Sequence, residues 1–244
     1  MTSATYPSLR ERTVFITGGA TGIGAELVCA FAAQGARVHF VDIDDAAGRE
    51  LAASTGARFE CVDVTHVAQL KAAILDAGQV NVLINNVAND ARHDPLTLTE
   101  QSWRQSLAVN LDPAFFAAQT VIPMMQAAGG GSIINFSSIN ALIGPEQMAG
   151  YVTAKAGLLG MTKALARQFG VDQIRVNALL PGWVVTERQL TQWLTPEAEQ
   201  AWSELVAIKQ RILPSHVASL ALFLAADDSA MITGQQFIID AGRV

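Results

Sequence analysis

The stretch TVFITGGATGIG, residues 13–24, joins an apolar run typical of a buried strand to a glycine-rich turn that opens a helical pattern. Its glycines, Gly18, Gly22 and Gly24, allow a tight turn and a close approach of the backbone to a pyrophosphate at a helix N-terminus. With Thr21 and Ile23, they are predicted to bind the phosphates of a dinucleotide. An ordinary glycine-rich turn is the local alternative, but the strand before it and the helix after it favour nucleotide binding.

Further β-rich runs follow at intervals along the chain. They are RVHFV (37–41), RFECV (58–62), VNVLI (80–84), SIINF (132–136), RVNAL (175–179) and QFIID (236–240). Most are almost continuously apolar, and helix-sized segments separate them, which predicts a mostly parallel sheet with both faces covered. We therefore expect a doubly wound α/β fold of the Rossmann type, with seven strands, helices on both faces and one domain over residues 1–244. Ligands of such sheets bind at the carboxyl ends of the strands.

Asp42 directly follows the run RVHFV, 18 residues after Gly24. A carboxylate near this spacing binds the ribose hydroxyls of a dinucleotide and would repel a 2′-phosphate, which favours NAD over NADP. A strand-end or helix-capping aspartate is the alternative, although Asp44 or Asp45 could take the capping role. Asp63, with Val64 beside it, is a candidate for the adenine side, and a turn aspartate is almost as good an interpretation.

Six motifs occur in the order and spacing of the short-chain dehydrogenase/reductase family, which the chain resembles over essentially its whole length. They are TGGATGIG, NNVA (85–88), VNL around Asn110, INFSS (134–138), YVTAK (151–155) and PGWVVT (181–186). The resemblance implies hydride transfer with a nicotinamide cofactor. It also assigns to the cofactor Asn86, Val87, Ala88, Tyr151, Lys155, Pro181, Gly182, Val184 and Thr186. The family pattern after the fourth strand is NNAG, so Val87 and Ala88 are departures from it.

Tyr151 and Lys155 are four residues apart and would share one face of a helix. A phenol is a poor base at neutral pH, and a nearby ammonium lowers its pKa, so Tyr151 could accept a hydroxyl proton. The alternative is that Tyr151 and Lys155 are only a surface pair on a helix, without a catalytic role. The resemblance makes Ser138 the residue that orients the substrate. It also makes Asn110 the support of a water chain to Lys155, whereas local sequence alone suggests a helix cap.

The segments NDARH (89–93), WVVTERQ (183–189) and WLTPEAE (193–199) are similar to bacterial aldose 1-dehydrogenases, particularly those that act on xylose and related sugars. Such enzymes oxidise the anomeric hydroxyl to a lactone with NAD. A sugar pocket needs several fixed donors and acceptors. The candidates are Asn89, Arg92, Ser138, Asn140, Gln147, Tyr151, Trp183 and Arg188. Bland alternatives remain: an ion pair of Asp90 with Arg92, a turn cap at His93, and a solvated Arg188.

Residues 186–213 contain Trp193 and Trp202 and a helix start at Thr195-Pro196-Glu197. The resemblance makes this segment a lid over the substrate, and packing of the tryptophans is the alternative. Small residues in 151–169 would allow close packing between subunits, and the resemblance suggests a homotetramer or a dimer.

Net charge is −6, and no basic stripe suggests a nucleic-acid partner. No run reaches transmembrane length and the start of the chain has no apolar signal region, so we expect a cytoplasmic protein without a membrane partner. Cys29 and Cys61 are expected to be buried free thiols. We assign no metal.

Three other functions remain open. The nearest is an NAD-dependent dehydrogenase of a sugar acid, such as a 2-keto-3-deoxy acid, with Arg92 or Arg188 binding the carboxylate. A reductase of acyl-thioester ketones would normally favour NADP, against Asp42. A non-catalytic nucleotide-binding scaffold is disfavoured by the presence of Ser138, Tyr151 and Lys155 together.

Overall fold

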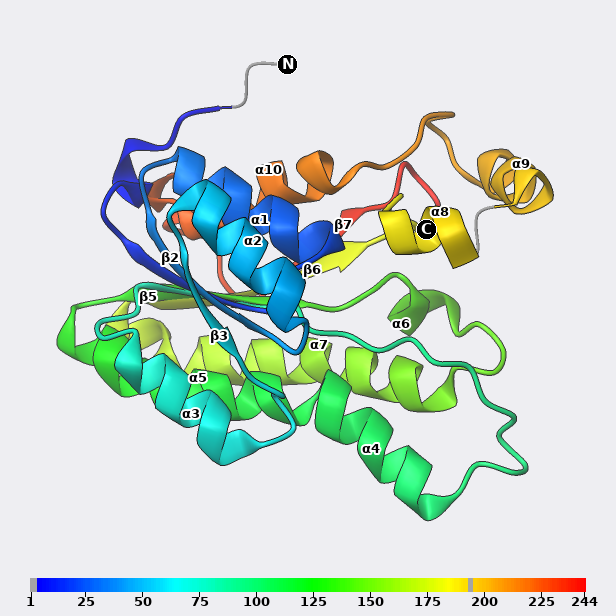
Figure 1. Ribbon diagram of the computed structural model, residues 1–244, viewed down its shortest axis with the longest axis horizontal. Helices are drawn as coiled ribbons and strands as arrows, with labels where there is room; N and C mark the ends of the chain where they lie inside the picture. The colour runs from blue at the N-terminus through cyan, green and yellow to red at the C-terminus, as the bar shows by residue number, and fades with distance from the viewer. Residues whose placement is uncertain (1–3, 193–194) are drawn as a thin grey trace.

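The computed structural model describes residues 4–192 and 195–244, so Trp193 lies outside the described residues. Seven strands form one sheet in the order β3-β2-β1-β4-β5-β6-β7, and every strand pairing is parallel (Figure 1). The strands are β1 (Thr13–Thr17), β2 (Arg37–Asp42), β3 (Arg58–Cys61), β4 (Val82–Asn85), β5 (Gly131–Phe136), β6 (Ile174–Pro181) and β7 (Gln236–Ile239). The order reverses between β1 and β4, where doubly wound sheets form their ligand crevice. The predicted Rossmann-type fold is confirmed.

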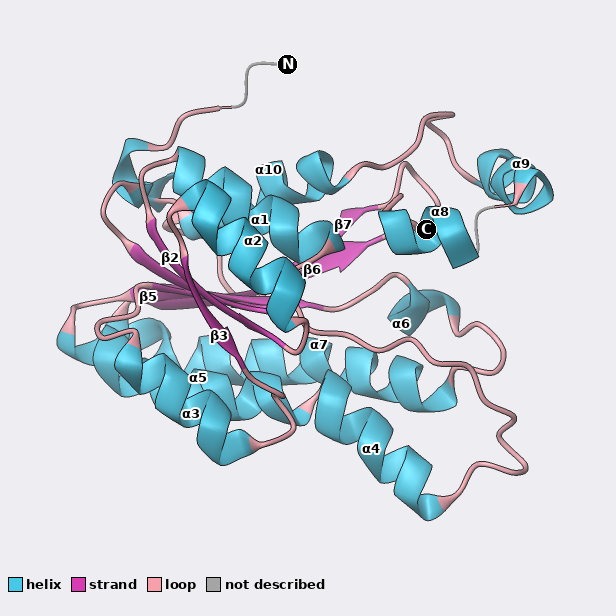
Figure 2. Cartoon of the chain, in the orientation of Figure 1, coloured by secondary structure: helices cyan, strands magenta, loops and turns pink. Residues whose placement is uncertain are grey.

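Helices cover both faces of the sheet (Figure 2). They are α1 (Gly22–Ala33), α2 (Asp45–Thr55), α3 (Val67–Asp76), α4 (Glu100–Asn110), α5 (Asp112–Ala127), α6 (Asn140–Ile143), α7 (Ala149–Phe169), α8 (Glu187–Gln192), α9 (Pro196–Leu205) and α10 (Pro214–Ala225). In Figure 1, α1, α2 and α10 lie above the sheet, and α3, α4, α5 and α7 lie below it. The short helices α8 and α9 extend beyond one end of the sheet, as does the loop between β4 and α4.

Strand β1 shows why the sheet is buried on both faces. Val14 and Ile16 point into a core that also contains Leu27 and Phe31 of α1. Phe15, between them, belongs to the opposite core, with residues of α3, α5 and α7. Successive side chains of a strand point to opposite faces, so a continuously apolar run serves two cores at once.

The two cysteines are free, but the expectation that they are buried is wrong, because both are exposed. Cys29 lies on α1, whose buried residues include Leu27, Val28 and Phe31, and position 29 falls on the other side of the helix. Cys61 ends β3, an edge strand that pairs with β2 alone, so its surroundings are less complete.

Within residues 4–192 and 195–244, every helix is too short or too polar to cross a membrane.

Candidate active site

The glycine-rich turn after β1 is held against the end of β4. The Asn86 side-chain amide donates to the Gly18 carbonyl at 2.8 Å and to the Thr17 carbonyl at 3.2 Å. The Thr17 hydroxyl accepts from the Asn86 backbone N–H at 3.1 Å. With the bond from the Val87 N–H to the Thr17 hydroxyl at 3.4 Å, four hydrogen bonds join the two carboxyl ends on either side of the reversal in strand order.

The backbone of this turn packs so closely that side chains would not fit at its glycines. A Cβ on Gly24 would lie 1.8 Å from the Gly18 carbonyl oxygen, and one on Gly18 would lie 2.9 Å from the Val87 side chain. Gly18 has φ +68°, a conformation that glycine adopts readily. Thr21, at the N-cap of α1, makes no side-chain capping bond. A tight turn running into a helix start that lacks a side-chain cap fits a pyrophosphate.

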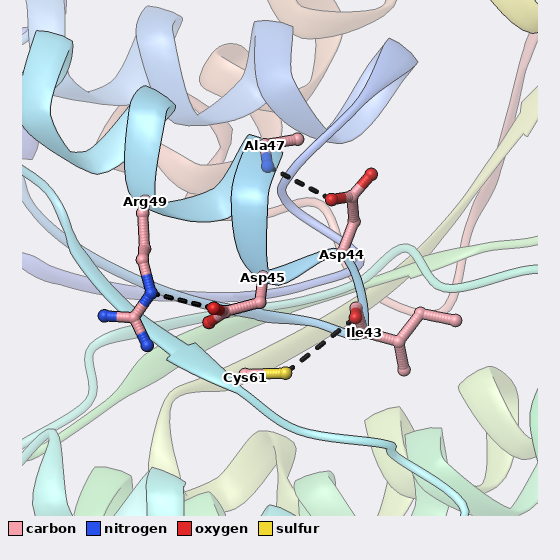
Figure 3. Close-up of polar contacts among 6 residues, drawn as sticks. All are labelled: Ile43, Asp44, Asp45, Ala47, Arg49 and Cys61. Atoms are coloured by element: carbon pink, nitrogen blue, oxygen red, sulfur yellow. Dashed lines mark hydrogen bonds and ion pairs between the residues drawn. The ribbon is translucent and has the colours of Figure 1, made fainter.

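Asp42, the last residue of β2, lies beside this turn. One carboxylate oxygen accepts from the Ala20 N–H at 2.9 Å and the other from the Asp44 N–H at 3.1 Å. Asp42 is thus fixed at the place where the sequence predicts a ribose-binding carboxylate. The capping role falls to Asp44, which accepts from the Ala47 N–H at 3.1 Å at the start of α2 (Figure 3).

More charged and polar groups surround the end of β2. Asp45 pairs with Arg49 on α2 at 2.9 Å, and the Cys61 thiol lies 3.8 Å from the Ile43 carbonyl oxygen. Both contacts are drawn in Figure 3. Asp63 accepts from the Thr65 N–H at 2.9 Å and from its hydroxyl at 2.7 Å, the bonding of a turn aspartate. Val64 beside it is buried. Asp63 therefore stabilises the turn after β3, and a contact with the adenine of a dinucleotide stays a prediction.

Residues 181–186 close the cofactor side at the end of β6. A Cβ on Gly22 would lie 3.3 Å from the Thr186 side chain, so this segment reaches the glycine-rich turn. A Cβ on Gly182 would lie 2.8 Å from the Asp240 backbone. Val184 is buried and forms an isolated parallel bridge with Ile212. The structure thus brings the three predicted cofactor segments together: residues 18–24, 86–88 and 181–186.

Ser138, Tyr151 and Lys155 meet at the carboxyl end of β5. All are buried, and Lys155 is only 1% exposed. The Lys155 ammonium nitrogen donates to the Phe136 carbonyl at 2.7 Å and lies 5.7 Å from the centre of the Tyr151 ring. Tyr151 and Ser138 share a side-chain hydrogen bond.

The protein groups alone do not lower the pKa of Tyr151. Burial raises this pKa to about 12, against the hydrogen bond with Ser138, which lowers it, and with a smaller rise from the Asp90 carboxylate. Burial also lowers the pKa of Lys155 to about 7. The expectation that the protein's own lysine brings the phenol below its ordinary pKa is therefore wrong here, because desolvation penalises the charged forms of both residues.

Asn110, the last residue of α4, holds the loop that follows β4. Its side-chain oxygen accepts from the Asn89 N–H at 2.8 Å, and its side-chain NH2 donates to the Asn89 carbonyl at 3.0 Å and to the Ser106 carbonyl at 2.9 Å. The residue is 3% exposed. Asn110 is a clamp on a neighbouring loop, and its cap-like bond to Ser106 is only part of that bonding.

The residues proposed to bind substrate are only partly brought together. Asn140 lies two residues after Ser138, and its N–H donates to the Ser138 hydroxyl at 3.1 Å. The Asn89 side chain accepts from the Ala91 N–H at 3.1 Å and so shapes its own turn. Gln147 has an exposed side chain and a left-handed backbone, φ +62°. Arg92 is exposed, and the Arg188 side chain lies outside the described part of the structure.

Trp183 joins the site to the segment predicted as a lid. Its indole N–H donates to Gln189 of α8 at 2.6 Å, and its ring packs edge-on against Trp202 of α9 with ring centres 5.8 Å apart. At the base of the segment, the Val185 N–H donates to the Ile212 carbonyl at 2.8 Å. The two ends of the predicted lid therefore lie side by side.

The sequence did not indicate two of these contacts. Gln189 was not a candidate, and His93 was considered only as a turn cap or, less favoured, as a side chain available to the sugar. The structure places His93 against the start of α7, where its ring nitrogen accepts from the Gly150 N–H at 3.4 Å. Because 57 residues separate the partners, no local pattern could have shown the contact.

Comparison with known proteins agrees with this geometry. A family model described as enoyl-(acyl carrier protein) reductase matches residues 18–243. The chain is 47% identical to a probable galactose dehydrogenase of Rhizobium meliloti (strain 1021), with 98% of each chain covered. It is 45% identical to the D-xylose 1-dehydrogenase of Caulobacter vibrioides (strain NA1000 / CB15N), with 99% of each covered. The chain belongs to the short-chain dehydrogenase/reductase family.

Solved structures of the family share the whole fold. A putative short-chain alcohol dehydrogenase from Sinorhizobium meliloti 1021 superimposes with a TM-score of 0.90 at 29% identity, over 97% of this chain and 98% of that one. The short-chain dehydrogenase/reductase is thus an oxidoreductase with a nicotinamide cofactor.

Proposed function

We propose that this short-chain dehydrogenase oxidises an aldose at C1 with NAD, giving a lactone. The observation that carries the proposal is the buried group of Ser138, Tyr151 and Lys155 beside a dinucleotide turn. The choice of an aldose is supported by full-length identity of 45–47% to a galactose dehydrogenase and a D-xylose 1-dehydrogenase. Both relatives are named for sugars.

The residues divide the chemistry between them. Tyr151, as phenolate, takes the proton of the C1 hydroxyl, and Ser138 donates a hydrogen bond to the same oxygen and orients it. Lys155, when charged, favours the phenolate from its position over the ring. A bound nicotinamide would supply the acceptor for the hydride that leaves C1. Gly18, Gly22 and Gly24 would hold the pyrophosphate of the dinucleotide, and residues 181–186 would hold its nicotinamide.

NAD, rather than NADP, is proposed from Asp42. Its carboxylate is fixed by the Ala20 and Asp44 N–H groups at the end of β2, next to the glycine-rich turn. A 2′-phosphate placed there would face a negative charge held in position. Asp44, whose N–H donates to Asp42, adds further negative charge close by, whereas the charge of Asp45 is paired with Arg49.

Trp183 and the segment 186–213 are proposed to cover the sugar. Trp183 offers an apolar ring beside the cofactor segment, and its contact with Trp202 joins it to α9. A closed segment would exclude water from the hydride path. The oligomeric state is proposed to be a homotetramer, on family resemblance.

A sugar panel tests the substrate class. Pentoses, hexoses and 6-deoxyhexoses are offered with NAD, and NADH absorbance is read, alongside the matching aldonic and 2-keto-3-deoxy acids. We expect turnover on neutral aldoses. Turnover confined to the acids would overturn the proposal in favour of a sugar-acid dehydrogenase, with Arg92 or Arg188 as the carboxylate partner.

Tyr151→Phe tests the mechanism. It removes only the hydroxyl, so turnover is expected to fall by roughly 10²–10⁴-fold while NADH binding, followed by fluorescence, is retained. Turnover close to that of the unaltered enzyme would contradict the assignment of Tyr151 as the base.

A further inference from the structure

The start of α7 carries the catalytic tyrosine, and its own sequence provides no cap. Tyr151 is the third residue of the helix, within the first turn, whose N–H groups have no partner inside the helix. Met148, at the N-cap, makes no side-chain capping bond. Helices fray first at their ends, and an uncapped end frays more easily. The first turn of α7, which must hold the catalytic base in place, is such an end.

His93 contacts this turn from the loop after β4. Its Nε2 accepts from the Gly150 N–H at 3.4 Å, and its backbone N–H donates to the Gln147 carbonyl at 2.8 Å. For Nε2 to accept, the imidazole must be neutral with its proton on Nδ1. One residue thus makes two hydrogen bonds to the chain on both sides of the N-cap.

The packing around Gly150 leaves no room for a side chain at this position. A Cβ on Gly150 would lie 2.8 Å from the Ser106 hydroxyl of α4 and 3.6 Å from the His93 ring. Gln147, three residues earlier, has φ +62°, which costs a non-glycine residue about 1 kcal/mol or more. The bond from the His93 N–H helps to hold this unfavourable conformation.

The loop that carries His93 is fixed at its other end too. Asn110 grips the Asn89 backbone through both its N–H and its carbonyl. Residues 90–92 therefore span two anchored positions, and the Asp90 carboxylate lies close enough to act on Tyr151. A displacement of this loop would move His93 and, through its hydrogen bonds, the first turn of α7.

We propose that His93 is a positioning residue that caps the catalytic helix from the substrate-side loop and so fixes the orientation of Tyr151. It acts through the Gly150 and Gln147 backbone and does not touch the reacting atoms. The inference rests on the proposed function only in that Tyr151 is the base.

The test compares His93→Ala with His93→Gln, whose side-chain oxygen can replace Nε2 as acceptor. In His93→Ala, amide hydrogen exchange in the first turn of α7 is expected to rise about fivefold, as for loss of a helix cap. The turnover number is expected to fall fivefold or more, because small displacements of a catalytic group are costly. The KM for the dinucleotide is expected to stay unchanged. In His93→Gln, both the exchange rate and the turnover number are expected to return most of the way to the values of the unaltered enzyme.

His216→Ala is the matched control. His216 caps α10 by the same chemistry, with its Nδ1 accepting from the Leu213 N–H at 3.1 Å, and α10 carries no catalytic residue. This variant should lose a comparable cap without change in turnover number or in exchange at α7.

Each other outcome overturns the inference. Unchanged exchange and turnover would show that the cap is not needed. Faster exchange with normal turnover would make His93 a structural cap only. Reduced turnover or a raised sugar KM with normal exchange would make it a direct substrate contact. If the unaltered enzyme oxidised no aldose, the proposed substrate would fail, but the exchange measurements would still test the cap.

Discussion

Replacing Lys155 by methionine is expected to stabilise the folded protein while destroying activity. Lys155 is 1% exposed, and burial lowers its pKa from 10.5 to about 7. A lowered lysine pKa means that folding opposes the charged form. The free-energy cost of burying the charged lysine is fully present below its pKa in the folded protein. It decreases as the pH rises above that value and is gone above its pKa in the unfolded protein. The difference of about three and a half pH units corresponds to about 5 kcal/mol.

The variant would not recover all of this energy. The methionine side chain could not donate to the Phe136 carbonyl, which Lys155 does at 2.7 Å, and an unsatisfied buried acceptor costs about 1–3 kcal/mol. A net gain of about 2–4 kcal/mol remains at or below pH 7, which corresponds to a rise in Tm of roughly 5–15 °C. Between pH 7 and 10.5 the gain is expected to shrink by about 1.4 kcal/mol per pH unit, because the unfolded wild type binds the additional proton there.

The assay is urea unfolding of both proteins at one fixed protein concentration, at pH 7, 8 and 9, with circular dichroism as the signal. Lys163→Met is the control, since Lys163 lies on the same helix but is exposed, and no pH-dependent change is expected there. A Lys155→Met variant that is less stable than the wild type at pH 7 would refute the reasoning. So would a stability difference that stays constant from pH 7 to 9.

Three further changes test the site. Asp42→Asn keeps an acceptor but removes the charge, so the preference for NAD over NADP is expected to fall roughly tenfold or more in kcat/KM. Gly24→Ala places a Cβ 1.8 Å from the Gly18 carbonyl oxygen, and NADH affinity by fluorescence titration is expected to fall at least about tenfold. Gly160→Ala, with open space around the new Cβ, should leave that affinity unchanged. Asn110→Ala frees the loop after β4, so turnover is expected to fall about tenfold or more; an unchanged rate would argue against the clamp.

The fold could be predicted because its determinants are local. Continuously apolar strands such as TVFIT are what a sheet covered on both faces requires, and Gly18, Gly22 and Gly24 mark where the first crossover begins. Asp42 at the end of β2 followed from spacing in the same way. Each of these positions is fixed by residues within about 20 positions along the chain.

The errors have a different physical origin. Whether Cys29 is buried depends on its position around the axis of α1. Cys61 is exposed because β3 is an edge strand. The pKa of Tyr151 depends on how completely the surrounding chain removes water, which a spacing of four residues from Lys155 does not reveal. These quantities are set by contacts between distant segments.

The polar segment 85–93 after β4 illustrates how such contacts serve function. Asn86 holds the glycine-rich turn through the Gly18 carbonyl. Three residues later, Asn89 is held by Asn110 of α4, and His93 in turn holds the start of α7. The segment therefore joins the phosphate turn, the substrate-side loop and the catalytic helix in one short run of chain. Because each join uses backbone groups, a change of side chain at Asn86, Asn110 or His93 should alter the relative placement of cofactor, substrate and base without removing any group that reacts.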